Sequence, residues 1–88
     1  MGKTTEQEVL SVIKSVVDNL KKEEDSSAPE TMLQKDQSFG QDIGLDAHGA
    51  FVLGQKIEER FGLYFVSAQT ILNTTVGDLV AKVCKKRN

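Results

Sequence analysis

The sequence predicts an all-α protein: a small bundle of three longer helices and one short helix, with a long loop after the first helix. Apolar residues recur at three- and four-residue steps in three segments, helix-capping residues precede those segments, and the 88 residues include only one proline. Alternating apolar runs, which are typical of strands, are few. A chain of this length forms one small domain, so we expect a single domain over residues 1–88.

Composition excludes several classes of protein. The 11 basic and 13 acidic residues give a net charge of -2, so the chain offers no strongly basic surface to DNA or RNA. Cys84 is the single cysteine, which cannot form an internal disulfide or a structural zinc site by itself. No apolar run approaches the ~20 residues that span a bilayer, and the start lacks a signal-peptide pattern. We therefore expect a cytoplasmic, monomeric domain that holds no metal, does not insert into membranes and is not an enzyme.

Residues 5–21 form the first predicted helix. Thr5 and Glu8 have the spacing of a capping box, in which both side chains accept hydrogen bonds from backbone amides at a helix start. The apolar side chains behind them keep helical spacing: Val9, Leu10, Ile13, Val16, Val17 and Leu20. This pattern predicts an amphipathic helix with one buried face.

The next segment, up to Asp46, is predicted to form the long loop. Its first part is polar, lacks a period and contains Pro29. Between Glu23 and Asp46, seven acidic residues and a single base, Lys35, make the chain locally acidic. A connection of this length needs apolar anchors in a small domain, and three residues are available for that role: Met32, Leu33 and Phe39.

Residues 47–61 form the second predicted helix. Asp46 is a favoured N-cap residue, and Gly62 stands where a left-handed residue ends a helix. Five residues between them form an apolar stripe, which two more widen: Ala50, Leu53, Gly54, Ile57 and Phe61, then Phe51 and Val52.

Two further helices complete the predicted bundle. Ser67 is expected to cap a short helix over residues 68–71, and Thr74 or Thr75 to cap the last helix. The buried face of the last helix is predicted to hold Val76, Leu79, Val80, Val83 and Cys84. Basic residues gather in its last turn, where they complement the negative end of the helix dipole.

From Lys35 to Val83 the ordered motifs resemble the acyl carrier protein family, and the first helix fits as well. The motifs are Ser38-Phe39, Gln41-Asp42-Ile43-Gly44, Asp46-Ala47-His48, Glu58-Glu59-Arg60-Phe61 and Thr74-Thr75-Val76. The resemblance implies an acyl-carrier-like domain without catalytic activity. Such a domain carries acyl groups as thioesters on a 4'-phosphopantetheine arm among enzymes of fatty-acid, polyketide or related synthesis. A phosphopantetheinyl transferase attaches the arm.

The attachment position departs from the family pattern. The family has a serine at the start of the second helix, and this chain has Ala47, followed by His48 in place of a leucine. Alanine has no hydroxyl, so 4'-phosphopantetheine cannot be attached to this chain as written. Two explanations stay open: a carrier whose serine was replaced by alanine, which we favour, or a natural non-carrying relative that acts by protein–protein interaction. The codon for residue 47 in the natural gene separates them.

The resemblance also implies a surface for the transferase and for acyl-chain synthesis or transfer enzymes. Its motif and partner-facing residues are expected to be Asp46, His48, Val52, Glu58 and Glu59. Gly49 and Val52 occupy positions that are acidic in many family members, so this surface is less acidic and indicates a specialised partner.

By the same resemblance, an acyl-chain cavity lies between the second and third helices. The expected lining residues are Phe39, Ile57, Phe65, Thr70, Asn73 and Leu79. Asn73 stands at a position that is apolar in the family, and Phe65 is bulkier than the common isoleucine. We therefore expect a smaller or more polar cavity.

Two other interpretations of the polar residues fit less well. Neighbouring residues on a helix point apart, so Glu58 and Glu59 do not form a catalytic pair. A calcium loop that begins at Asp36 fails, because Gln41 stands where the loop needs glycine and Ala47 where it needs glutamate. His48 is either a contact residue beside the attachment position or simply an exposed residue at a helix start.

Overall fold

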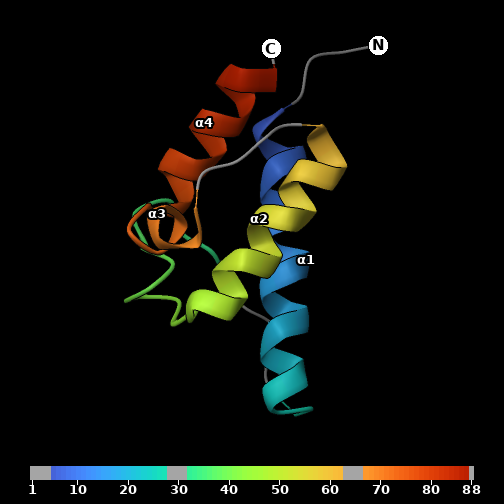
Figure 1. Ribbon diagram of the computed structural model, residues 1–88, viewed down its shortest axis with the longest axis vertical. Coiled ribbons are helices and arrows are strands. Elements are labelled where there is room, and N and C mark those ends of the chain that lie inside the picture. The colour runs from blue at the N-terminus through green and yellow to red at the C-terminus, as the bar shows by residue number, and fades with distance from the viewer. Residues whose placement is uncertain (1–4, 28–31, 63–66, 88) are drawn as a thin grey trace.

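The computed structural model describes residues 5–27, 32–62 and 67–87, and within them the chain forms four helices and no strand (Figure 1). In chain order these are α1 (Glu6–Glu24), α2 (Ala47–Phe61), α3 (Ala68–Leu72) and α4 (Val76–Arg87). The prediction of an all-α bundle with three longer helices and one short helix is confirmed. The described parts of the connection between α1 and α2, residues 25–27 and 32–46, contain turns and no helix.

The helix starts follow the capping residues of the sequence. The amide of Glu8 donates to the Thr5 hydroxyl at 3.2 Å, which confirms the capping box of α1. The Thr75 hydroxyl, rather than that of Thr74, caps α4 by accepting from the amide of Asp78 at 3.2 Å. Helix α1 runs three residues beyond its predicted end, because the lysine and glutamates of residues 22–24 favour helix without needing an apolar contact.

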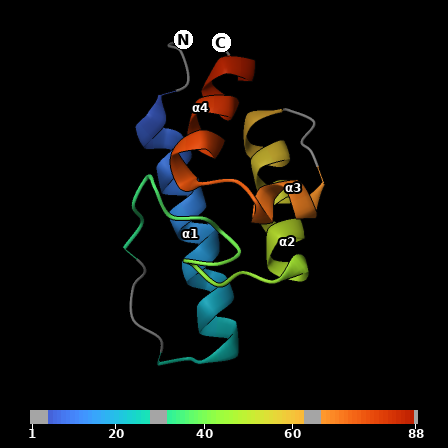
Figure 2. The ribbon, with the colours of Figure 1, turned by 90° about the vertical axis from the view of Figure 1, so that its left-hand side faces the viewer.

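Helices α2 and α4 each pack against α1, and the short helix α3 lies across their direction (Figures 1 and 2). Helix α1 contacts α2 and α4, and α2 contacts α3. All four helices and the segment before α2 contribute to one core: Val9, Ile13, Val16, Val17, Phe39, Ile43, Leu45, Ala50, Leu53, Ile57, Phe61, Ile71, Val76, Leu79, Val80 and Val83. Burial of these side chains is the main stabilising contribution in so small a domain.

Two apolar side chains lie outside this core, against the sequence prediction. Met32, an expected loop anchor, is 79% exposed, and Phe51, expected to widen the apolar stripe of α2, is 56% exposed. Leu33 and Val52 are half-buried against the core, as predicted. The apolar stripe of α2 is wider than the surface that α1 and α3 cover, so the side chain at its edge faces solvent.

A set of backbone hydrogen bonds ties the segment before α2 to the corner between α3 and α4. The amides of Phe39 and Gly40 donate to the carbonyls of Thr74 and Leu72 at 3.2 and 3.1 Å. In the other direction, the amide of Val76 donates to the carbonyl of Gln37 at 2.9 Å, and the amide of Gly77 to that of Lys35 at 2.9 Å. We call these four bonds the 35–40/72–77 ladder. With the side chain of Phe39 fully buried, they fix the chain that enters α2.

Gly40→Ala tests this ladder. A Cβ at position 40 would lie 2.9 Å from the Leu72 carbonyl oxygen, which is the acceptor of the Gly40 amide. We expect the free energy of unfolding in urea to fall by about 1–3 kcal/mol, because the two backbone segments of the ladder must move apart. Gln41→Ala is the control: its exposed side chain lies next to the ladder, and we expect a change within about 0.5 kcal/mol. Equal effects of the two substitutions would contradict the close approach at Gly40.

Candidate functional site

The candidate attachment position lies at the exposed start of α2. Ala47 is the first residue of the helix and is exposed, and Asp46 is the N-cap residue before it. The Asp46 carboxylate accepts a hydrogen bond from the amide of Gly49 at 2.7 Å. The first-turn amides therefore have one carboxylate acceptor, and the methyl group of Ala47 points away from the core.

The backbone before α2 turns so that Asp46 reaches its capping position. Gly44 has φ 86°, a left-handed conformation that favours glycine. The amide of Leu45 then donates to the Phe39 carbonyl at 2.8 Å, and the Leu45 side chain is buried. The start of α2 is thus fixed by its connection to the 35–40/72–77 ladder.

Gly49 has a packing role that the sequence did not reveal. It is buried in the first turn of α2, and a Cβ there would lie 3.2 Å from Leu45 Cδ2 and 3.6 Å from Leu20 Cδ1 of α1. The missing side chain lets α2 approach α1 closely. Packing against Leu45 and Leu20 therefore explains why position 49 holds glycine rather than an acidic residue.

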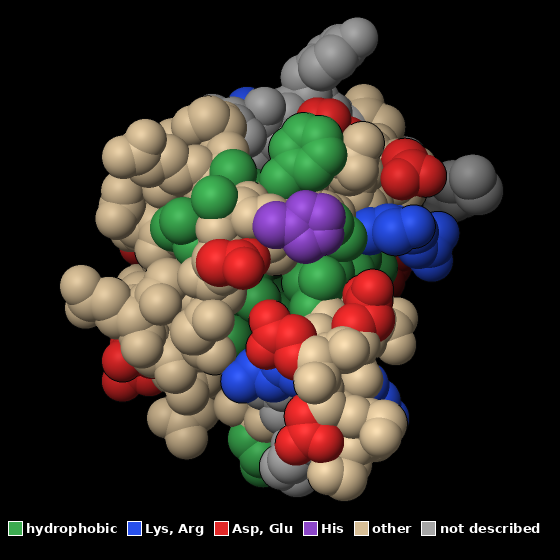
Figure 3. Space-filling model, turned by 60° about the horizontal axis from the view of Figure 1, so that its bottom comes forward, with side chains coloured by type: hydrophobic (Ala, Val, Ile, Leu, Met, Phe, Trp, Pro, Cys, Tyr) green, Lys and Arg blue, Asp and Glu red, His purple; other side chains and the backbone are tan. Residues whose placement is uncertain are grey.

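The five predicted partner-facing residues are divided between exposed and half-buried positions. Asp46, His48 and Glu59 are exposed, whereas Val52 and Glu58 are half-buried. The histidine lies on the molecular surface with hydrophobic side chains beside it (Figure 3). Val52 packs against the core.

The six residues expected to line an acyl-chain cavity lie in different surroundings. Phe39, Ile57 and Leu79 share the hydrophobic core, with at most 1% of each residue exposed. Thr70 is half-buried and Asn73 is exposed. Phe65 lies outside the described residues.

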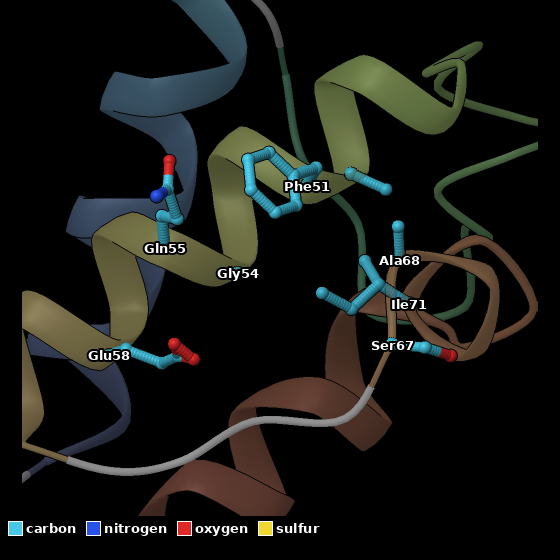
Figure 4. A pocket seen from close by; sticks show the side chains of 8 residues that line it. Phe51, Gly54, Gln55, Glu58, Ser67, Ala68 and Ile71 are labelled. Carbon is cyan, nitrogen blue, oxygen red and sulfur yellow. The ribbon is translucent and has the colours of Figure 1, made fainter.

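A pocket of about 230 Å³ lies between α2 and α3 (Figure 4). Its lining residues are Ala50, Phe51, Gly54, Gln55, Glu58, Ser67, Ala68 and Ile71. Of these, only Glu58 was expected from the sequence to belong to a site. The signal that could have indicated the pocket is the group of small residues Ala50, Gly54 and Ala68, which leaves space between the two helices.

The remaining features to consider in the described residues are a metal site, a reactive thiol and a membrane-spanning helix. Those residues hold no group of three or more histidine, cysteine, aspartate or glutamate side chains placed to bind a metal ion. Burial raises the pKa of the half-buried Cys84 thiol, and the charges of Glu6 and Glu8 raise it further, so the thiol stays protonated at neutral pH. Within the same ranges, no helix has the length and apolar character needed to cross a membrane.

No family model, curated protein or solved structure matches this chain.

Asp46→Ala tests the cap at the candidate site. The substitution removes the acceptor of the Gly49 amide, and we expect the free energy of unfolding in urea to fall by about 1 kcal/mol. Asp46→Asn is the matched control, because its amide oxygen can accept the same hydrogen bond and asparagine is an equally favoured N-cap residue. The same loss for both variants would show that the side-chain oxygen does not stabilise α2.

Proposed function

We propose that this chain is an acyl carrier protein for fatty-acid, polyketide or related synthesis, blocked in this form at Ala47 and without catalytic activity of its own. The observation that carries the proposal is the exposed position of Ala47 at the first residue of α2, directly after the capping Asp46. The resemblance places the attachment serine of the family at this residue. We also propose that the protein is cytoplasmic and monomeric, and that it neither binds nucleic acid nor inserts into membranes.

The geometry supports an attachment position at residue 47. A serine hydroxyl there would be exposed to a transferase, because Ala47 itself is exposed. The amides of the first helical turn and the positive end of the helix dipole favour the negative charge of a phosphodiester. The chain as written does not fit the arm, however, since the Ala47 methyl group cannot form that bond.

The exposed surface of α2 is the proposed recognition surface for the phosphopantetheinyl transferase and for acyl-chain enzymes. Asp46 and His48 flank the attachment position and are both exposed. Glu59 adds an exposed carboxylate near the other end of the helix. A partner with basic residues would therefore meet acidic groups at both ends of α2.

A second candidate function is a natural acyl-carrier-like protein that carries nothing and acts by protein–protein interaction. Two observations favour it: the missing hydroxyl at Ala47 and the 56% exposed ring of Phe51 one turn further along the same face of α2. In this case the exposed surface of α2 binds a partner, and residue 47 has no hydroxyl to which an arm could be attached.

Loading of an Ala47→Ser variant tests the carrier proposal. We expect incubation with coenzyme A and a broad-specificity phosphopantetheinyl transferase to add the mass of one phosphopantetheine, measured by intact-protein mass spectrometry. The parent chain is the control. It keeps Ser67, an exposed serine at the start of α3, and we expect no mass gain from it.

Helicity measured by circular dichroism establishes that the variant is folded. A folded Ala47→Ser variant that gains no mass would overturn the carrier proposal and favour the interaction protein. Mass gain by the parent chain would show that the attachment position lies elsewhere.

A further inference from the structure

The 35–40/72–77 ladder joins two segments that have little regular structure of their own. Residues 32–46 contain turns and no helix, and α3 has five residues with one buried side chain, Ile71. A helix of this length is unstable in isolation, because too few hydrogen bonds follow its first turn to offset the cost of forming that turn. Each of the two segments therefore depends on the other, and on the core, for its conformation.

The core is distributed unequally between these segments and the longer helices. Helices α1, α2 and α4 contribute four buried apolar residues each, whereas residues 32–46 and α3 contribute four between them: Phe39, Ile43, Leu45 and Ile71. If the two segments detach together, the contacts of α1 with α2 and with α4 can remain. Detachment exposes four apolar side chains but returns the conformational entropy of both segments, so fewer contacts are lost than in complete unfolding.

The start of α2 is connected to the same contacts. Asp46 accepts two hydrogen bonds from the first turn of the helix: the Gly49 amide reaches its carboxylate at 2.7 Å, and the Ala50 amide reaches its carbonyl at 2.9 Å. The residue before it, Leu45, is buried and donates its amide to the Phe39 carbonyl at 2.8 Å. If Phe39 and Leu45 leave the core, Asp46 is no longer held at the helix start, and both of its bonds to the first turn are released.

We propose that residues 35–46 and 67–75, here called the coupled unit, open and close together, so that the order of the first turn of α2 depends on the corner between α3 and α4. In the closed state Asp46 caps α2. In the open state α1, α2 and α4 stay packed, and the first turn of α2 loses both acceptors. A molecule that binds only the closed corner, where Asn73 is exposed, stabilises the order at residue 47 from a distance. The inference goes beyond the carrier function, because the coupling needs no group attached at Ala47.

Independent fraying of the first turn of α2 fits the structure less well. Gly49 is buried, and a Cβ there would lie 3.2 Å from Leu45 Cδ2 and 3.6 Å from Leu20 Cδ1. Ala50 is fully buried as well, so the turn cannot unwind without disturbing Leu45. Since the Leu45 amide is bonded to the Phe39 carbonyl, the movement extends from the helix start to the ladder.

Hydrogen exchange of the folded full chain, followed residue by residue in two-dimensional NMR spectra, tests the proposal. Five backbone amides report the coupled unit, each donating to an acceptor within residues 39–46 or 72–74: Phe39, Gly40, Leu45, Gly49 and Ala50. The slowest amides of α1 report complete unfolding. In low concentrations of urea we expect the five amides to share one opening equilibrium, at least about tenfold more populated than complete unfolding. Its dependence on urea is expected to be weaker, because less surface becomes exposed.

Two matched substitutions separate the coupled unit from the rest of the domain. Ile71→Val removes one buried methyl group inside the unit, and Ala81→Gly weakens α4 at an exposed position outside it. We expect Ile71→Val to accelerate exchange of the five amides and of the slowest α1 amides alike, about fivefold, since the lost contact is absent from the open and the unfolded states. Ala81→Gly is expected to accelerate only the slowest α1 amides, about fivefold, because α4 stays helical in the open state.

Gly40→Ala perturbs the ladder itself, since its Cβ would lie 2.9 Å from the Leu72 carbonyl oxygen. We expect it to accelerate exchange of the Gly49 and Ala50 amides as strongly as that of Phe39.

Three results would contradict the proposal. If Ala81→Gly accelerates the five amides as much as the slowest α1 amides, the domain opens only as a whole. If Gly40→Ala accelerates the Phe39 amide but leaves those of Gly49 and Ala50 unchanged, the start of α2 frays independently of the corner. If the five amides differ from one another in their dependence on urea, they do not belong to one unit.

Discussion

The arrangement of this protein depends on the 35–40/72–77 ladder. Its four backbone hydrogen bonds join a segment before α2 to the corner between α3 and α4, two regions far apart in the sequence. The isolated bridge between Ser38 and Thr75 lies in the middle of this contact, and the buried Phe39 ring fixes it to the core. Ordering a loop of this length costs conformational entropy, and few apolar side chains of the loop offset that cost by burial.

The ladder also determines where the candidate site lies. Only a few residues connect Phe39 to the start of α2. The hydrogen bond from the Leu45 amide to the Phe39 carbonyl restricts the conformation of this connection further. Asp46 consequently has little freedom, and its carboxylate reaches the amide of Gly49. The exposure of Ala47 is thus a result of backbone geometry some distance away, and it does not depend on the side chain at position 47.

Sequence patterns predicted the features that depend on neighbouring residues. The bounds of α2 follow from an N-cap aspartate and a left-handed Gly62, both of which act within one turn of the helix. The exposure of Phe51 and the pocket beside Gly54 were not predicted, because both depend on how much of α2 is covered by α3. Helical spacing places Phe51 on the apolar stripe, but it cannot show where the neighbouring helix ends.

The pocket between α2 and α3 is lined from the same face of α2 that carries the candidate attachment position. Ala47, Phe51 and Glu58 lie along one face of α2, since steps of four and seven residues return to the same side of a helix. The pocket residues Phe51 and Glu58 therefore lie on the side of α2 that also carries residue 47. Replacing a serine by alanine at that residue removes the nucleophile but none of the side chains that line the pocket. The two proposed functions, carrier and interaction protein, therefore share the same surface of α2 and differ in the side chain that they require at residue 47.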